Sequence, residues 1–143
     1  MPTVEKSVVI QVPVEKVWEA YVGLDGWLQW NHHMREVKLL EGAPLDVGKR
    51  ARITLKTGIS SEWEVTELTP GKSFTWASQV VPGLRLDFAH GVLPADGGAR
   101  AVLRIQSSGP VAALAAPVLG LVYSRNLVHA LDNLKRLLEG SPE

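Results

Sequence analysis

Residues 84–107 read LRLDFAHGVLPADGGARAVLRIQS, and this stretch decides the fold class. Apolar and polar residues alternate on both sides of Asp96-Gly97-Gly98, which is typical of two half-buried β-strands joined by a tight turn. One face of the first strand carries four apolar residues and a histidine, namely Leu84, Leu86, Phe88, His90 and Val92. The stretch therefore predicts an antiparallel hairpin with an apolar inner face.

The same period of two runs upstream of this hairpin nearly to residue 36. Turn residues interrupt it at Gly42-Ala43-Pro44, Gly58, Pro70-Gly71 and Pro82-Gly83, which bound strands rather than continue them. With the alternating opening segment included, the predicted strands are Val4–Val12, Glu36–Leu40, Lys49–Lys56, Ser61–Leu68, Ser73–Val80, Leu84–Val92 and Ala99–Ser107.

Helical spacing appears after the first strand and again near the end of the chain. Two short helices are predicted, over residues 14–21 and over Asp25–Asn31. A long final helix is predicted by leucines that recur four, three and four residues apart, at Leu127, Leu131, Leu134 and Leu138. Consecutive hairpins imply an antiparallel meander, and one long helix packed on it makes an α+β fold.

Length and composition limit the class of protein. The chain has 143 residues, which fits one domain over 1–143 with a core of its own. Fifteen Lys and Arg balance fifteen Asp and Glu, so the chain lacks the overall basic charge of nucleic-acid binders. The absence of cysteine excludes disulfides, thiolate chemistry and zinc sites built on sulfur.

The sequence predicts a cytoplasmic protein without stable membrane insertion. Residues 1–5 lack the basic start and apolar core of a signal peptide. The longest uncharged apolar run, Val111–Tyr123, is interrupted by Pro117 and Gly120 and is shorter than the roughly 20 residues of a membrane span. Absence of cysteine also suits a reducing compartment.

The long helix has an uneven inner face. When residues are projected at 100° each, the leucine stripe continues toward the start of the helix as small residues, at Ala113, Ala116, Pro117, Gly120 and Ser124. Because interiors are close-packed, these residues either meet large side chains of the sheet or border a cavity. The residues alone leave both possibilities open.

The same projection directs Val118, Leu119 and Val122 away from the leucine stripe. An apolar outer face without charge indicates a partner subunit, another covering element or a ligand entrance. A homodimer is one expectation from this face.

Several motifs, in this order along the chain, resemble the helix-grip, START-like (SRPBCC) superfamily, which includes polyketide cyclase/dehydrase-like proteins and the birch-pollen allergen. They are residues 12–18 (VPVEKVW), 26–30 (GWLQW), 47–50 (VGKR), 69–74 (TPGKSF), His90 with 96–99 (DGGA), and Leu134-Lys135. The resemblance implies a curved antiparallel sheet of about seven strands wrapped around the C-terminal helix. It also implies an elongated cavity for an apolar or aromatic ligand. It supplies no reaction, since members include cyclases, dehydratases, lipid carriers and hormone receptors.

His90 is the candidate for chemistry, because alternation places it on an apolar inner face. It is interpreted as a general acid/base, as a ligand contact, or as a core histidine bonded to backbone. The other candidate ligand-binding residues are aromatic walls, small residues and hydrogen-bond donors, namely Trp63, Trp76, Phe88, Gly120, Tyr123, Ser124 and Asn126. Adjacent histidines at His32-His33 have no further ligands at chelating spacing, so neither a metal nor a cofactor is predicted.

Three functions follow. The leading one is binding of a small hydrophobic ligand, lipid-like or aromatic and polyketide-like, between the sheet and the C-terminal helix. The second is a cyclase or dehydratase that uses His90 as acid/base and Tyr123 as a hydrogen-bond donor to a developing enolate. The third is a protein-interaction domain that docks through residues 111–123.

Overall fold

The central hairpin extends further than the alternation predicts. In the computed structural model, which describes residues 3–140, it consists of β6 (Leu84–Ala95) and β7 (Gly98–Ser108). The two strands pair from Ala95↔Gly98 at the turn to Arg85↔Ser108 at the open end. Gly97 adopts a φ of 81°, a left-handed conformation that favours glycine in such a turn.

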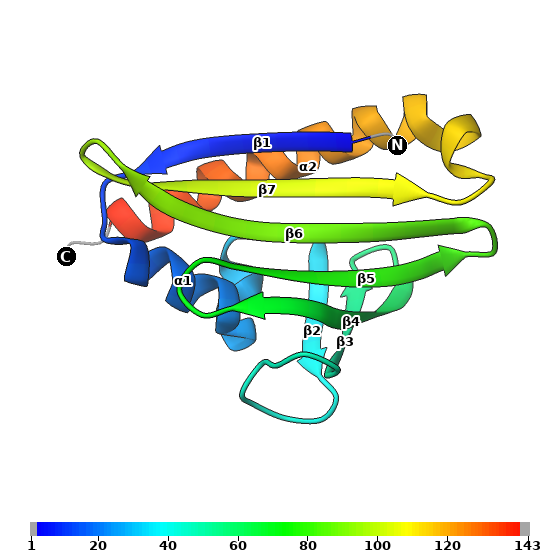
Figure 1. The fold of residues 1–143 in the computed structure, drawn as a ribbon, viewed down its shortest axis with the longest axis horizontal. Coiled ribbons are helices and arrows are strands. Elements are labelled where there is room, and N and C mark those ends of the chain that lie inside the picture. Colours follow the sequence, from blue (N-terminus) through cyan, green and yellow to red (C-terminus); the bar gives the residue numbers. More distant parts are fainter. Residues whose placement is uncertain (1–2, 141–143) are drawn as a thin grey trace.

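Seven strands form one antiparallel sheet, in the order β1-β7-β6-β5-β4-β3-β2 (Figure 1). The remaining strands are β1 (Thr3–Ile10), β2 (Met34–Leu39), β3 (Arg50–Leu55), β4 (Ser60–Thr69) and β5 (Ser73–Val81). Consecutive strands from β2 to β7 are neighbours, whereas β1 crosses over to pair with β7 at the far edge. The predicted α+β meander is therefore confirmed. Its first strand, β1, lies at the edge of the sheet beside β7.

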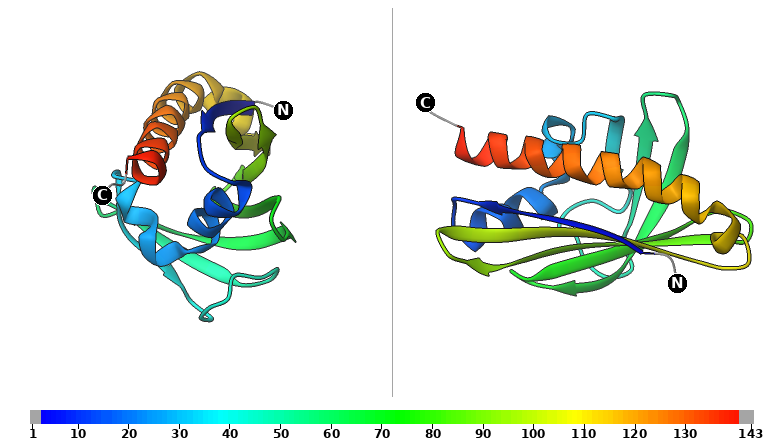
Figure 2. Two further views of the ribbon diagram at one scale, coloured as in Figure 1. Left: turned by 90° about the vertical axis from the view of Figure 1, so that its left-hand side faces the viewer. Right: turned by 90° about the horizontal axis from the view of Figure 1, so that it is seen from above.

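The long helix α2 (Ala112–Glu139) runs along the concave side of the sheet, and the strands curve around it (Figure 2). It contacts β1 and β7 of the sheet and the short helix η1 (Leu24–Gln29). Its second half supplies most of its buried residues, at Leu127, Ala130, Leu131 and Leu134. This arrangement confirms the helix-grip architecture expected from the resemblance.

The final turn of α2 is tied to the end of β1. Lys135 Nζ donates to the carbonyl of Val9 at 3.0 Å and to Glu139 Oε2 at 2.7 Å. The same carboxylate oxygen accepts from the backbone N–H of Gln11 at 2.6 Å. These bonds satisfy backbone groups at the point where β1 ends and fix the helix axis relative to the sheet edge.

Two short helices follow β1, α1 (Val14–Val22) and η1, at the same end of the sheet as the C-terminus of α2 (Figure 1). The second is a 3₁₀-helix that ends at Gln29, shorter than predicted. Tyr21 Oη donates to the carbonyl of Gly91 at 2.8 Å, and Trp27 Nε1 donates to the carbonyl of Tyr21 at 2.9 Å. Side-chain hydrogen bonds thus join α1 to β6 and η1 to α1.

An aromatic cluster fills the interior between these helices and the sheet. Its members are Tyr21, Trp27, Trp30, Phe74, Trp76 and His90, each at most 1% exposed. Neighbouring rings lie within contact distance, such as Trp27 and Trp76 with centroids 5.1 Å apart. The interior between the sheet and the helices α1 and η1 is therefore a packed core.

The turn of the β6–β7 hairpin approaches the end of β1 closely at Gly98, and a substitution at this residue tests the importance of that contact. A Cβ at this position would overlap the carbonyl oxygen of Ile10, a backbone atom held by strand pairing. We expect Gly98→Ala to lower the free energy of unfolding by about 2 kcal/mol, since overpacking of this kind costs roughly 1–3 kcal/mol. Chemical denaturation measures the change.

Gly26→Ala is the matched control, because a Cβ at Gly26 meets nothing within 4 Å. It should leave stability unchanged or raise it slightly. An equal loss in both variants would contradict the packing argument.

Candidate functional site

A hollow of about 160 Å³ separates the first half of α2 from the sheet. We call it the inner hollow; its walls are Thr3, Val4, Leu86, Ile105, Ser107, Ala116, Leu119, Gly120 and Tyr123. The strand residues come from β1, β6 and β7, and the rest come from α2. The small-residue half of the helix thus borders a cavity.

A second cavity lies beside the inner hollow, between β1 and α2. This wider and more open groove of about 540 Å³ shares four walls of the inner hollow, Thr3, Val4, Ala116 and Gly120. This outer groove is also lined by Glu5, Lys6, Pro117, Leu121 and Ser124. The inner hollow therefore adjoins a rim that carries one carboxylate, on Glu5, and one ammonium group, on Lys6.

Gly120 keeps this space open. A Cβ built at Gly120 has no atom within 4 Å, so the missing side chain borders empty volume on both sides of the wall. Native interiors otherwise leave few voids larger than a water molecule. Gly120 therefore leaves room on the wall of both cavities that a larger side chain would occupy.

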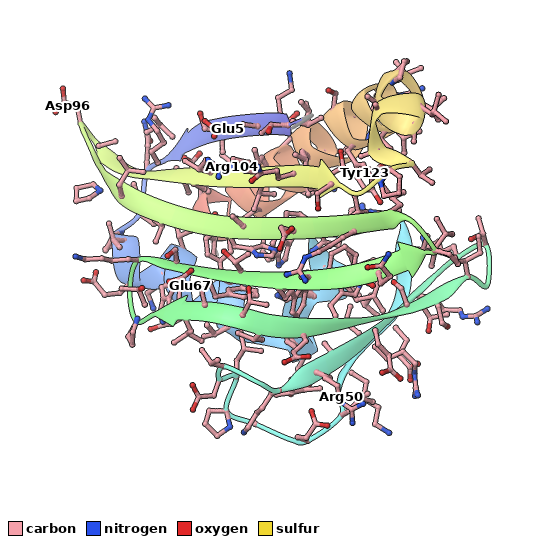
Figure 3. All side chains as sticks on the ribbon, turned by 45° about the vertical axis from the view of Figure 1, so that its right-hand side comes forward. Glu5, Arg50, Glu67, Asp96, Arg104 and Tyr123 are labelled. Atoms are coloured by element: carbon pink, nitrogen blue, oxygen red, sulfur yellow. The ribbon has the colours of Figure 1, made fainter. Side chains whose placement is uncertain are left out.

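Tyr123, labelled in Figure 3, lies on α2. It places a polar group on the wall of the inner hollow. Burial raises the pKa of its hydroxyl, so the group stays protonated at neutral pH. Among residues 3–140, no hydrogen-bond partner of this hydroxyl is found. The phenol is thus available to donate to an acceptor inside the cavity.

The helix face differs in detail from the projection. Leu119, expected to look away from the sheet, lines the inner hollow, whereas Ala113 and Pro117, expected to face the sheet, are exposed. A fixed 100° step accumulates error over many residues, and the contact face of α2 turns gradually as the helix follows the twisted sheet. The first helical turns consequently overhang the sheet.

The structure separates the other predicted site residues from this cavity. Gly120 and Tyr123 line the inner hollow and Ser124 lines the outer groove, while Asn126 lines neither. Trp63, Trp76, Phe88 and His90 also lie outside both cavities. Trp76 and His90 belong to the aromatic cluster, and Trp63 and Phe88 pack beside it.

His90 lies between two aromatic rings. Its ring stacks on Phe74 at a centroid distance of 4.2 Å and on Phe88 at 4.3 Å. Nδ1 lies 3.3 Å from the carbonyl of Phe74 and donates to it in the matching tautomer. The geometry is that of a core histidine bonded to backbone.

Burial lowers the pKa of His90 from 6.5 to about 3, so the ring is neutral at pH 7. Nε2 is buried and has no hydrogen-bond partner among the described residues, and the same holds for Trp76 Nε1, on a ring 5.6 Å away. Solvent has no access to the ring, since the side chain is 0% exposed. A general acid/base must reach its substrate, and nothing in this position provides that contact.

A second groove, of about 720 Å³, was not indicated by the sequence. It lies between α1–η1 and the loop after β2, and its apolar walls include Trp18, Leu24, Val37, Leu39, Leu45 and Leu68. The loop is held by Lys49 Nζ, which donates to the carbonyls of Gly42 at 3.0 Å and Pro44 at 2.6 Å. The sequence offered one signal, the apolar Leu45 directly after the turn residues 42–44, and the structure buries its side chain.

Metal-ligating clusters are absent from the described part of the chain. No group of three or more His, Asp or Glu side chains in residues 3–140 is arranged to hold a metal ion. His32 instead contacts Asn133, with Nδ1 3.3 Å from the amide nitrogen.

Sequence comparison matches residues 1–139 to one family, described as polyketide cyclase/dehydrase and lipid transport. The chain belongs to this family. The resemblance read from the motifs is therefore confirmed over almost the whole chain. No curated protein is significantly similar in sequence.

Solved structures of this family's fold are similar at low identity. Ara h 8.0201 superposes with a TM-score of 0.77 at 14% identity, covering 97% of this chain and 98% of its own. Protein MLL2253 from Mesorhizobium loti gives 0.76 at 19%, with 99% of both chains covered. The di-domain ARO/CYC StfQ from the steffimycin biosynthetic pathway gives 0.75 at 16%, covering 94% of this chain and 50% of its own. These likenesses show the shared fold.

The buried His90 predicts loss of stability in acid. Its folded pKa lies below the unfolded value, so the unfolded state binds more protons and stability falls as pH drops below 6.5 toward 3. From pH 7 to pH 5 we expect a loss of about 2 kcal/mol from this residue, at 1.36 kcal/mol per pH unit below 6.5. Denaturant titrations across this range measure it.

His90→Leu should flatten this part of the profile, because an apolar side chain of similar size takes no proton. A variant with an unchanged slope would show that other groups, such as the half-buried His33 with its lowered pKa, cause the acid sensitivity.

Proposed function

We propose that the protein binds a small hydrophobic molecule in the inner hollow, with the outer groove as its mouth. Family membership implies hydrophobic ligand binding, without naming the ligand. The observation that carries the proposal for this chain is the open space at Gly120, opposite strand residues of β1, β6 and β7. The small residues in the first half of α2 leave this space unfilled. A bound ligand would occupy the volume that larger side chains on α2 would otherwise fill.

The dimensions and polarity describe the ligand. Sites for drug-sized molecules occupy about 300–1,000 Å³, so the inner hollow holds one end of a ligand and the outer groove holds the rest. The buried end is apolar, against Leu86, Ile105 and Leu119. A single carbonyl or hydroxyl oxygen accepts the hydrogen bond of Tyr123. Lipid-like and planar aromatic or polyketide-like molecules both meet this description.

The cyclase or dehydratase alternative receives no comparable support. It needs His90 and a second polar group to converge on one reacting atom. His90 is neutral, fully buried and outside the cavity that Tyr123 lines.

A cytoplasmic location and the absence of nucleic-acid partners remain part of the proposal. The lack of cysteine supports the location, and the lack of net charge supports the absence of nucleic-acid partners.

Native mass spectrometry of gently purified protein, followed by extraction under denaturing conditions, tests the proposal directly. We expect an apolar molecule at near-stoichiometric occupancy. Protein that is empty and that also fails to enhance the fluorescence of anilinonaphthalene sulfonate would contradict it.

Gly120→Leu should fill the cavity. A leucine there projects into the open space of the wall, so affinity for anilinonaphthalene sulfonate should fall at least about tenfold, as expected when roughly 1.4 kcal/mol of binding is lost. Ala113→Leu adds the same side chain on an exposed position of the same helix and should bind like the wild type. Equal binding by all three proteins would place the ligand elsewhere, for instance in the 720 Å³ groove.

Tyr123→Phe should remove one hydrogen bond and little else. A net hydrogen bond contributes about 0.5–1.5 kcal/mol, so affinity for tetralone, which carries a ketone, should fall about 2- to 12-fold. Tetralin, which lacks the oxygen, should bind both proteins alike. Displacement of anilinonaphthalene sulfonate measures both, and a parallel loss for the two compounds would contradict the donor role.

A further inference from the structure

The outward face of α2 is apolar between Leu114 and Val128, and nothing in residues 3–140 covers it. Five large aliphatic side chains lie on it, Leu114 at 84% exposed, Leu121 at 68%, Val118 at 65%, Val122 at 45% and Val128 at 40%. Scattered exposed aliphatic residues are ordinary, but a contiguous stripe marks an interaction site. The stripe is separate from the sheet-facing residues that line the inner hollow.

Spacing along the stripe matches a helical partner. Leu114, Val118, Leu121, Arg125 and Val128 follow one another at intervals of four, three, four and three residues. Two helices that wind around each other contact through residues at this heptad spacing. We call these five residues the seam.

The charge pattern favours a second copy of this chain as the partner. By length and composition α2 also meets the criterion for a membrane-crossing helix, but its second half belongs to the core of the domain. Helices that lie on a membrane surface carry Lys and Arg beside the apolar face. Residues 111–124 contain no charged side chain, and Arg125 is the one charged residue of the seam. A helix with a similarly uncharged face is therefore the complementary surface, and every copy of the chain presents one.

We propose that two copies of the chain associate through α2, packed antiparallel about a twofold axis between Val118 and Leu121. Each Val118 then meets Leu121 of the second copy, and each Leu114 packs on the aliphatic stem of Arg125 of the second copy. The charged end of Arg125 stays at the rim, where interfaces are polar. Antiparallel packing also aligns the two helix dipoles favourably.

The seam is short, which sets the strength of the association. It runs over 15 residues, from Leu114 to Val128, which is about 21 Å at a rise of 1.5 Å per residue. An interface built on one helix pair of this length lies at the small end of specific interfaces, so dissociation constants in the micromolar range are expected rather than an obligate dimer.

Association would also alter the mouth of the cavity. Leu121 belongs both to the seam and to the wall of the outer groove. A second helix packed on Leu121 would therefore lie beside the groove and narrow the opening to the inner hollow. The interface rests on the exposed residues alone and does not depend on ligand binding.

Cysteine crosslinking tests the geometry, because the chain has no cysteine of its own. We expect a mixture of Val118→Cys and Leu121→Cys proteins to form a mixed disulfide under mild oxidation. Leu114→Cys should not crosslink with itself, since the two copies of this residue lie roughly 16 Å apart along the antiparallel axis. Self-crosslinking of Leu114→Cys would indicate a parallel pair and overturn the proposal.

Sedimentation equilibrium tests the association itself. Wild-type protein should dimerise in the micromolar range, and Val118→Asp should weaken this by roughly 100-fold, because the charge is buried twice in the symmetric interface. Ile59→Asp is the matched control, since Ile59 is 66% exposed but lies between β3 and β4. It should dimerise like the wild type.

Two outcomes would overturn the proposal. One is a wild-type protein that stays monomeric up to several hundred micromolar. The other is a monomer whose binding to phosphatidylcholine vesicles is abolished by Val118→Asp and not by Ile59→Asp, which would assign the stripe to a lipid surface. Because Val118 lines neither cavity, its Asp variant should keep its ligand in native mass spectrometry, so failure of the dimer and failure of the proposed function are distinguishable.

Discussion

One helix has to cover the concave face of a seven-stranded sheet, and α2 covers it unequally. Leucines along its second half reach the strands, while Ala116 and Gly120 in the first half do not. The aromatic cluster fills the interior between the sheet and the helices α1 and η1, whereas the inner hollow lies under the first half of α2. The position of the cavity follows from this division of one helix into large and small residues.

The same division explains the state of His90. The residue lies in the filled end, where stacking against Phe74 and Phe88 excludes water and favours the neutral ring. Its unpartnered Nε2 reflects surroundings made of aromatic carbon. Tyr123 lies in the open end, keeps its proton and borders empty space. Two polar side chains on inner faces therefore have different roles, which are set by how densely the surrounding interior is packed.

Alternation and turn residues predicted the strands and the meander from β2 to β7, because the period of two is a property of the extended backbone itself. Leucine spacing predicted the covering helix. The place of β1 beside β7 was not predicted from the residues. Small residues on the helix left a filled core and a cavity equally open, and the structure places Gly120 beside a hollow that Tyr123 also lines. Alternation could not show whether Leu86 or Phe88, which are two residues apart on one strand, lines the hollow. Both face inward, but the curl of the sheet places Leu86 beside the hollow and Phe88 against His90. That distinction depends on twist and on the path of α2, which local sequence does not encode.

The pairing of β1 with β7 has a consequence for how the chain folds. Partners such as Thr3 and Gln106, or Ile10 and Ala99, are separated by roughly 90 to 100 residues. During synthesis β1 therefore has no strand partner until β7, the last strand, has been made. The helix α2, which packs on β1, is made after β7. Contacts of such long range slow folding. The meander from β2 to β7 is able to form first from local hairpins. The strand that is synthesised first, β1, and the helix that is synthesised last, α2, then pack onto it together.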